Sequence, residues 1–456
     1  MSKNYQAATS RALLSSRVLN REILRLTLPA LGTLVAEPLF RILDTAMVGH
    51  LGADILAGLG VGSTILTTAV ALMIFLAYAT TPAVARYVGA GRMGEAIQAG
   101  ISGIYLAALI GVLIALLLAL IPGLLVGFFL DGQSLAGRSA HTYLIISSAG
   151  VPAILITFAA SGLVRGLQDT LTPLLISGAG FACNAVLNAI FIYGLGWGIA
   201  GSATGTVIAE WGMAAALVWH INKKARATGA SWRPSLRGIK ASGIGGSWLL
   251  LRTLTLRVCT VLAVVAATQH STQAAAGFQI INSVFMLLAF IFDSLAIACQ
   301  ALIGKTLGAS DKVLTQKIVR RVALWGVYSG IIAGVLVALG ANFLGAIFTA
   351  DQAVLVILPQ AFITLAILQP LCAIVFIYDG VLIGAGDNKY LGLAGIFNLC
   401  CYSPAFALLV YNLQLDAGYY LSFNILAIMG VYMVSRLATL GLRVRSEKWL
   451  KFGIVR

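Results

Sequence analysis

Long apolar runs separated by short polar connections follow one another along the whole chain. A helix needs about 20 mostly apolar residues to cross the hydrocarbon core of a bilayer, and these runs reach that length. The pattern therefore predicts an all-α integral membrane protein with twelve transmembrane helices. We expect them at residues 23–49, 56–85, 96–121, 141–164, 171–194, 198–221, 243–268, 274–304, 321–348, 354–383, 390–412 and 416–440.

The longest polar connection, residues 223–242, divides the twelve spans into two sets of six. Segments of the two halves also match at a nearly constant offset. LAYATTPAVARYVGAG at 76–91 aligns with LAIACQALIGKTLGAS at 295–310 (295 − 76 = 219), and GLVRGLQDT at 162–170 with GVLIGAGDN at 380–388 (380 − 162 = 218). This internal repeat predicts two pseudo-symmetric six-helix bundles and a binding site between them. The expected lobes are 1–222 and 243–456, each with a cytoplasmic tail, joined by a cytoplasmic loop at 223–242.

Composition agrees with a membrane protein, since 60% of the residues are hydrophobic and 10% are charged. The net charge of +15 could suggest nucleic acid as a partner, but Lys and Arg gather in alternate loops, and the opposite loops hold only Arg138. By the positive-inside rule we expect both termini in the cytoplasm and a multi-pass protein of the plasma membrane. Anionic lipid, and no nucleic acid, is then the expected partner of the basic loops.

The first span carries three charged residues inside an apolar run. Glu37, Arg41 and Asp44 stand at i, i+4 and i+7, which places them on one stripe of a helix that Thr33 continues. A charged residue at the bilayer centre costs about 2.5–3.5 kcal/mol of insertion free energy even on the translocon scale. Three such residues in one span therefore indicate a functional role. Glu37 and Arg41 could form a structural ion pair, whereas Asp44, near the outer end of the stripe, suits a relay of protons or cations.

Two further polar stripes lie in spans five and six. Asn184 and Asn188 share one face of span five, and Ser202, Thr206 and Glu210 share one face of span six. These side chains could take part in function or could simply form hydrogen bonds between helices.

The second half carries charges of a different kind. Asp293 in span eight and Asp379 in span ten could pair with Arg252 and Arg257 of span seven, which we interpret as structural ion pairing. The acidic stripe of the first span has no counterpart there, because position 44 + 219 is Ala263.

No motif for catalysis or metal binding is present. GKT at 304–306 fails as a phosphate-binding loop, because its first glycine would be Cys299. HExxH, GxSxG and paired carboxylates are absent, and the six cysteines lie inside apolar runs without CxxC or Cys/His spacing. We therefore expect no enzyme, no metal and no cofactor, and any active transport must draw on an ion gradient.

Several segments together resemble one transporter family. LDTAMVGHLG after LPALG, the ARYVGAGR and GKTLGASDK ends of spans two and eight, GLVRGLQDT and YDGVLIGAGD look like the multidrug and toxic compound extrusion (MATE) transporters. FDSLAIACQALIG with YDGVLIGAGD points to the DinF-like branch, and the likeness covers nearly the whole chain. It implies twelve helices in two lobes arranged as a V, and export by rocker-switch motion against inward flow of protons or sodium.

The resemblance also implies roles for individual residues. In DinF-like members the aspartate at the position of Asp44 couples transport to the ion, and the first helix bends near a proline that matches Pro29. Asn184, Asn188 and Thr206 match the polar partners of that aspartate. Asn188 stands where many members have aspartate, so this site has one carboxylate fewer, which puts a sodium site of the usual charge in doubt.

We therefore expect a monomeric exporter of amphipathic small molecules that works by cation antiport, with H⁺ as the coupling ion and Na⁺ as the alternative. A lipid-linked precursor flippase of related fold is the rival hypothesis. Such a flippase would line its cavity with basic residues, for which Arg41, Arg252 and Arg257 are the candidates. A channel is disfavoured because no pore-loop signature is present. The sequence does not name the substrate.

Overall fold

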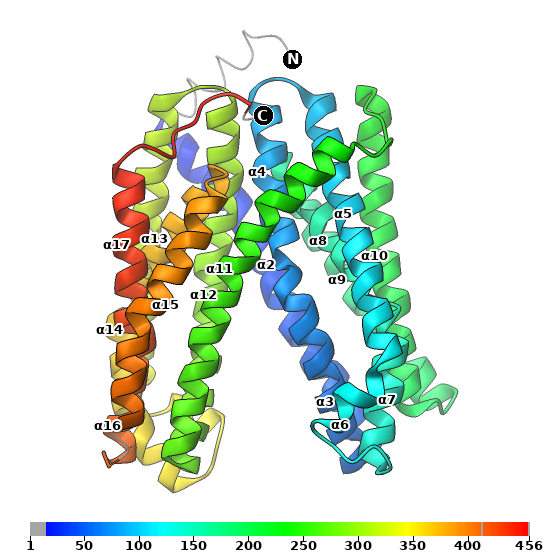
Figure 1. The fold of residues 1–456 in the computed structure, drawn as a ribbon, viewed down its shortest axis with the longest axis vertical. Coiled ribbons are helices and arrows are strands. Elements are labelled where there is room, and N and C mark those ends of the chain that lie inside the picture. The colour runs from blue at the N-terminus through cyan, green and yellow to red at the C-terminus, as the bar shows by residue number, and fades with distance from the viewer. Residues whose placement is uncertain (1–14, 412–413, 455–456) are drawn as a thin grey trace. The chain divides into compact units, whose positions relative to one another are not determined.

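The computed structural model describes residues 15–411 and 414–454, and all regular secondary structure in this part of the chain is helical (Figure 1). Within it, ten helical segments are long and apolar enough to cross a membrane, and α7 with α8, bent by 48°, forms an eleventh. The sixth predicted span falls on α10, which has 31 residues. The protein is thus a multi-pass membrane protein.

The helices of the first half follow the predicted order. They are α2 (Ser16–Gly49), α3 (Ala53–Ala71), η1 (Leu72–Ile74), α4 (Phe75–Gly89), α5 (Met93–Leu120), α6 (Pro122–Gly127), α7 (Leu135–Ser148), α8 (Val151–Gly166), α9 (Leu171–Ala189), η2 (Ile190–Gly194) and α10 (Gly198–Thr228).

The second half repeats this order. Its helices are α11 (Leu236–His270), α12 (Thr272–Gly308), α13 (Lys312–Gly340), η3 (Leu344–Ile347), α14 (Gln352–Gly384), α15 (Asn388–Tyr411), α16 (Ala417–Ile425), η4 (Leu426–Tyr432) and α17 (Met433–Arg445).

The chain forms two compact units. The N-terminal unit is Leu28–Gly246, and the C-terminal unit combines residues 15–27 with the described residues from Ser247 onward. Both α2 and α11 therefore pass from one unit into the other. The predicted connection at 223–242 is mostly helical, because α10 continues to Thr228 and α11 begins at Leu236. Ala, Lys and Arg in this stretch are good helix formers, and α10 ends only at Gly229, whose φ of 69° makes a left-handed cap.

Helix packing repeats between the units at the same offset as the sequence. A Cβ added at Gly162 of α8 would lie 2.7 Å from the carbonyl oxygen of Ala77 on α4. A Cβ added at Gly380 of α14 (380 − 162 = 218) would lie 2.9 Å from Cα of Ala296 on α12 (296 − 77 = 219). Each pair of helices approaches closely because a glycine stands at the crossing.

An ion pair is also repeated, at one end of each unit. Asp169, between α8 and α9, lies 3.6 Å from Nζ of Lys224, and Asp387, between α14 and α15, accepts a 2.7 Å hydrogen bond from Nε of Arg443. The arginine is the repeat partner of the lysine (443 − 224 = 219). Burial alone would raise the pKa of Asp169, but the hydrogen bonds from Thr172 and the charge of Lys224 lower it.

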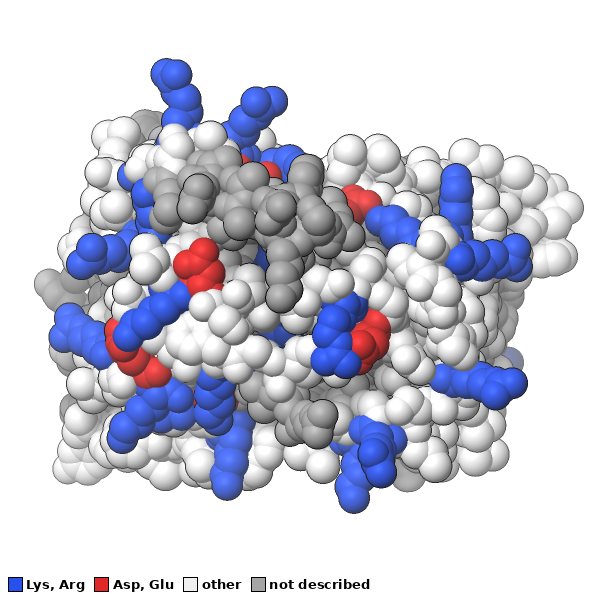
Figure 2. Space-filling view, turned by 90° about the horizontal axis from the view of Figure 1, so that it is seen from above, with Lys and Arg blue, Asp and Glu red and all other residues white. Residues whose placement is uncertain are grey.

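The end of the helices at which these ion pairs lie is rich in basic residues. Lys and Arg outnumber Asp and Glu on the face seen in Figure 2. Arg86 and Lys305 stand in the last turns of α4 and α12. By contrast, the flank of α5 exposes Leu109, Leu113 and Leu116, as a surface in contact with lipid would.

Candidate functional site

The candidate site lies in the N-terminal unit, around the carboxylate of Asp44 on α2. Oδ1 of Asp44 accepts hydrogen bonds from Nδ2 of Asn188 on α9, at 2.7 Å, and from Oγ of Ser202 on α10, at 2.9 Å. Both donors are fully buried, so three helices fix the carboxylate in place. Two donors on one oxygen suit an ionised carboxylate.

The network continues from Asn188 to two more of the predicted residues. Its Nδ2 also donates to Oδ1 of Asn184, at 2.8 Å, and Nδ2 of Asn184 donates to Oγ1 of Thr206, at 3.0 Å. A Cβ at Gly205 would lie 2.2 Å from Oδ1 of Asn188, so α9 and α10 can approach this closely only because residue 205 has no side chain. The structure thus brings Asp44, Asn184, Asn188 and Thr206 together.

Ser202 is the member of the network that sequence reasoning left outside the site. It precedes Thr206 by one helical turn, and the sequence placed both on one stripe of α10 without assigning Ser202 to Asp44. Only the position of α2 against α10 identifies it as a direct partner, since Ser202 and Asp44 are 158 residues apart.

Glu37 and Arg41 form an ion pair on the same face of α2. The Nη2 of Arg41 lies 2.7 Å from Oε1 of Glu37, and Nη1 donates to Oγ1 of Thr67 on α3, also at 2.7 Å. Glu210 of α10 lies close enough to interact electrostatically with both. Both side chains of the pair are about half exposed, at 49% for Glu37 and 51% for Arg41. Pro29 lies inside α2, which is helical from Ser16 to Gly49, and the bend that the resemblance implies near Pro29 stays a prediction.

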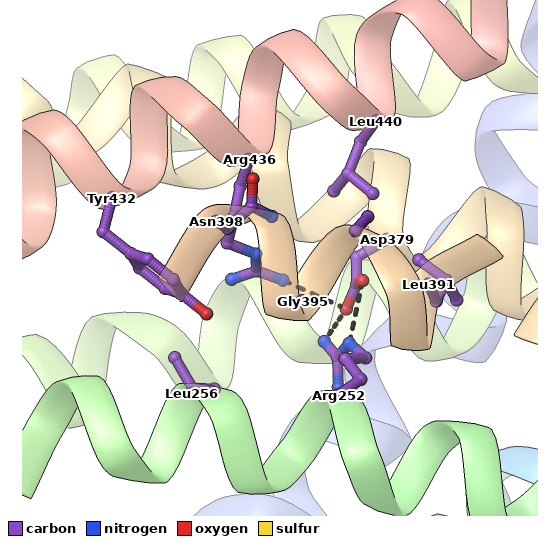
Figure 3. A pocket seen from close by; sticks show the side chains of 10 residues that line it. Arg252, Leu256, Asp379, Leu391, Gly395, Asn398, Tyr432, Arg436 and Leu440 are labelled. Atoms are coloured by element: carbon purple, nitrogen blue, oxygen red, sulfur yellow. Dashed lines mark hydrogen bonds and ion pairs between the residues drawn. The ribbon is translucent and has the colours of Figure 1, made fainter. Parts of the chain in front are cut away.

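A second charged cluster lies in the C-terminal unit (Figure 3). Asp379 of α14 is buried and pairs with Arg252 of α11, whose Nε donates to Oδ1 at 3.0 Å. Arg436 of α17 adds a second guanidinium, with Nη2 3.4 Å from Oδ2 of Asp379. Sequence reasoning missed Arg436, although a charge inside the last predicted span was a usable signal.

Arg257 and Asp293 are the other two charges that the sequence suggested for this cluster. Arg257 is exposed on α11 and forms no ion pair with any residue in the described ranges, so of the two candidate arginines only Arg252 holds Asp379. Residues 252 and 257 are five positions apart (257 − 252 = 5), which is more than one helical turn of about 3.6 residues, so the two side chains point in different directions. Asp293 lies half-buried on α12.

Many membrane-spanning helices in two repeated units, with charged side chains enclosed among them, define a secondary transporter type of fold. More particularly, the chain belongs to the MatE family, whose family model matches residues 29–190 and 249–409. The predicted resemblance to MATE transporters and the predicted fold class are thus confirmed.

Relatives and solved structures agree. Protein DETOXIFICATION 44, chloroplastic, of Arabidopsis thaliana is 30% identical, over 80% of this chain and 72% of its own. DNA damage-inducible protein F of Escherichia coli is 25% identical over 64% of both chains, and a probable multidrug resistance protein NorM of Thermotoga maritima is 24% identical over 81% of both.

Among structures, the bent form of the MATE transporter VcmN of Vibrio cholerae matches with a TM-score of 0.85 at 21% identity, covering 96% of this chain and 99% of its own. A MOP superfamily transporter from Pyrococcus furiosus matches with a TM-score of 0.83 at 20% identity, covering 94% and 96%. At these identities the likeness establishes the fold. The protein is therefore a MATE transporter whose relatives include multidrug and detoxification exporters.

Proposed function

We propose that this transporter exports amphipathic small molecules by proton antiport, using alternating access of the rocker-switch kind, and that Asp44 carries the proton. The proposal rests on one observation: Asp44 is the only ionisable side chain in a closed network of Asn184, Asn188, Ser202 and Thr206. Amides and hydroxyls cannot change charge near neutral pH, so any titration in this network belongs to Asp44.

The hydrogen bonds leave room for a proton. Both donors reach Oδ1 of Asp44, and within the described ranges no hydrogen bond to Oδ2 is formed. Protonation at Oδ2 can therefore occur without breaking the contacts that hold the carboxyl group. The change from charged to neutral weakens the pull of Asp44 on Asn188 and Ser202, which supports a shift between two arrangements of α2 against α9 and α10.

The same geometry supports H⁺ over Na⁺ as the coupling ion. Na⁺, a hard cation, is bound by several oxygen atoms. Here Nδ2 of Asn188 lies between Oδ1 of Asp44 and Oδ1 of Asn184, at 2.7 and 2.8 Å, and donates to both. A cation would have to displace this N–H₂ group, whereas a proton does not.

The flippase hypothesis receives less support. It requires a cluster of arginines that are available to a pyrophosphate, but Arg41 pairs with Glu37 and Arg252 pairs with Asp379. Of the three candidates, only the exposed Arg257 is without an ion pair in the described ranges. Arg41 and Arg252 are each neutralised inside their own unit, so the expected basic cluster is not formed. We therefore favour an exporter, acting as a monomer in the plasma membrane with both termini in the cytoplasm and with lipid at its surface. The name of the chloroplast relative describes that protein alone.

Asp44→Asn tests the proposal. Asparagine keeps the shape and the accepting oxygen of Asp44 but cannot exchange a proton, so the variant should fold and still bind substrate. Purified protein in liposomes should lose efflux driven by a proton gradient, down to the rate of empty liposomes, and should release no protons when substrate is added. Parental transport by Asp44→Asn, or efflux driven by sodium alone, would show the mechanism to be wrong.

Two variants serve as controls. Asn188→Ala removes one donor to the carboxylate, worth about 1.5–3 kcal/mol for a charged partner, and should weaken transport without abolishing it. Ala263→Asp places a carboxylate at the repeat position of Asp44 in the C-terminal unit (44 + 219 = 263), and in the Asp44→Asn background it should not restore coupling.

A further inference from the structure

Glu210 of α10 is a carboxylate of the N-terminal unit that lies outside the hydrogen-bond network of Asp44. It stands one helical turn beyond Thr206 (210 − 206 = 4), on the stripe of α10 that also carries Ser202. Glu210 is partly buried, and it forms no hydrogen bond or ion pair with any residue that the structure describes. Its charged form therefore lacks the kind of donors that hold the carboxylate of Asp44.

The charged neighbours of Glu210 stand on α2. Glu37 repels the charge of Glu210, and Arg41 attracts it. Arg41 is already engaged, because its Nε and Nη2 donate to Oε1 of Glu37 at 3.2 and 2.7 Å and its Nη1 donates to Thr67 at 2.7 Å. The attraction between Arg41 and Glu210 is thus offset by the like charge of Glu37 beside it.

The helices that pack on α10 bring no second cation to Glu210. The buried phenol of Tyr143 on α7 lies within electrostatic reach of Glu210. The other ionisable residues of α5, α7, α8, α9 and η2 do not act on Glu210, and all are exposed except Arg165, which stands in the last turn of α8. They are Glu95, Tyr105, Arg138, His141, Arg165, Cys183 and Tyr193.

The charged residues that α2 and α10 bring together therefore include more carboxylates than cations. Glu37 and Arg41 neutralise each other, and Asp44 and Glu210 remain as two carboxylates on which only this same Arg41 acts as a cation. With both ionised, the cluster carries two uncompensated negative charges inside apolar spans, which is costly. One proton on each carboxylate makes the cluster neutral.

Water reaches this cluster from one side. Glu37 and Arg41 are 49% and 51% exposed, although they stand in the middle of an apolar span. Charged side chains exposed to this extent lie against water rather than lipid. A proton can therefore reach Glu210 without passing through the network of Asp44.

The repeat indicates that the fold does not need a carboxylate at this position. The matching residue of the C-terminal unit is Met429 (210 + 219 = 429), which is buried. A last span of the same kind thus packs with an apolar side chain here, and Glu210 makes no polar contact that would fix α10 in place. A charged residue kept in a membrane span without a structural partner indicates a functional role.

The shift of α2 in the proposed mechanism would also change the surroundings of Glu210. Glu37 and Arg41 share a stripe of α2 with Asp44, so a movement of this helix against α10 changes their distances from Glu210. We propose that Glu210 carries a second proton in each transport cycle, taken up and released after that of Asp44. The inference rests on the proton antiport proposed above, and it makes the exchange one of two protons for each substrate molecule.

Infrared difference spectra test the second carboxyl group without any substrate. Purified full-length protein in lipid is titrated through the neutral pH range, in which a proton carrier must exchange its proton, and the band of protonated carboxyl groups is followed. Glu210→Gln should lose one component of this band. Glu95→Gln is the matched control: Glu95 is exposed and paired with Arg92, so it stays ionised in this range and its loss should change nothing. Identical titrations of Glu210→Gln and the parent would overturn the proposal.

The number of protons per cycle is measured in liposomes. Ethidium, a fluorescent amphipathic dye, serves as the probe, and potassium with valinomycin holds the membrane potential at zero. At steady state the logarithm of the dye ratio should rise with the imposed pH difference about twice as steeply for the parent as for Glu210→Gln. Equal slopes would remove the second proton but leave the antiport of Asp44 intact. Dye efflux by the parent that ignores the proton gradient would overturn the antiport and the second proton with it.

Two more variants separate a proton carrier from other roles of Glu210. Glu210→Asp keeps an ionisable carboxyl group and should retain the parental slope, which a substitution that merely disturbed packing would not do. Glu210→Met copies the residue at the matching position of the other unit, should behave like Glu210→Gln, and gives a second reading should that variant fold poorly. Loss of ethidium binding in Glu210→Gln with an unchanged infrared band would show that Glu210 binds substrate instead of a proton.

Discussion

At the scale of single residues, the repeat explains three unusual backbone conformations. Gln168, Ser310 and Glu447 have φ values of 68°, 59° and 54°, which side chains other than glycine rarely adopt. Each matches a glycine of positive φ in the other half. The left-handed turn is therefore a feature of the repeated fold and does not depend on which residue occupies the position. The matching glycines are Gly386, Gly91 and Gly229 (386 − 168 = 218, 310 − 91 = 219, 447 − 229 = 218).

Ser310→Gly should therefore stabilise the protein. Ser310 is exposed, and its backbone keeps a left-handed conformation that costs about 1 kcal/mol for a residue with a Cβ. Because glycine loses more entropy on folding, we expect a net gain of about 0.5 kcal/mol in the free energy of unfolding. Thermal unfolding in detergent measures it. Gly91→Ser at the matching position should lower stability by about 1 kcal/mol, and equal melting temperatures for the two variants would argue against strain at these turns.

The candidate site shows how far sequence reasoning reaches at this scale. Asp44, Asn184 and Asn188 were predictable, since a polar side chain in an apolar run is rare and helical spacing shows which ones share a face. Ser202 and Arg436 were not assigned, because their roles depend on contacts with helices far away in the sequence. Periodicity describes a single helix and does not determine which face meets which neighbour.

At the scale of helices, the close crossings of α8 on α4 and of α14 on α12 depend on glycine. Gly162→Ala should destabilise the N-terminal unit, because the added Cβ would meet the backbone of Ala77 at 2.7 Å, a distance that requires the helices to separate. We expect a cost of about 1–3 kcal/mol, measured as a fall in melting temperature.

Gly212→Ala on α10 is the matched control for that crossing. No atom lies within 4 Å of its added Cβ, so the same substitution should be neutral or slightly stabilising through helix propensity. If Gly162→Ala were as stable as Gly212→Ala, α4 and α8 would have to pack less closely than the structure indicates.

Helix limits were predicted less well than helix identity. Each predicted span falls on a helix, but a hydropathy window ends where apolar residues end, whereas a helix continues until its backbone is capped. Thus α10 continues beyond the apolar run to Thr228, where Gly229 caps it. The fourth predicted span is instead the bent pair of α7 and α8, which breaks at Ala149–Gly150, just before Pro152 in the first turn of α8.

At the scale of the whole molecule, the internal repeat was sufficient to predict two related six-helix units, but it did not predict their limits. Residues 15–27 pack with the C-terminal unit, and residues 236–246 of α11 pack with the N-terminal unit. The prediction assumed that residues close together in the sequence belong to the same unit. Both α2 and α11 are exceptions, because each is a single helix with residues in both units. Pro29 stands two residues after that crossing point in α2 (29 − 27 = 2).

Orientation in the membrane is the last prediction. Loops that are rich in Lys and Arg and adjoin membrane helices stay on the cytoplasmic side. Single cysteines at Asp54, Asp131 and Asp351, all exposed at the end of the helices that lacks basic loops, should react with an impermeant thiol reagent added to intact cells. A cysteine at Lys223 should react only after the membrane is opened, and a variant without cysteine gives the background. Labelling of position 223 in intact cells would reverse the orientation, because all basic loops would then face outward, and the proton that we propose Asp44 carries would have to enter from the other side.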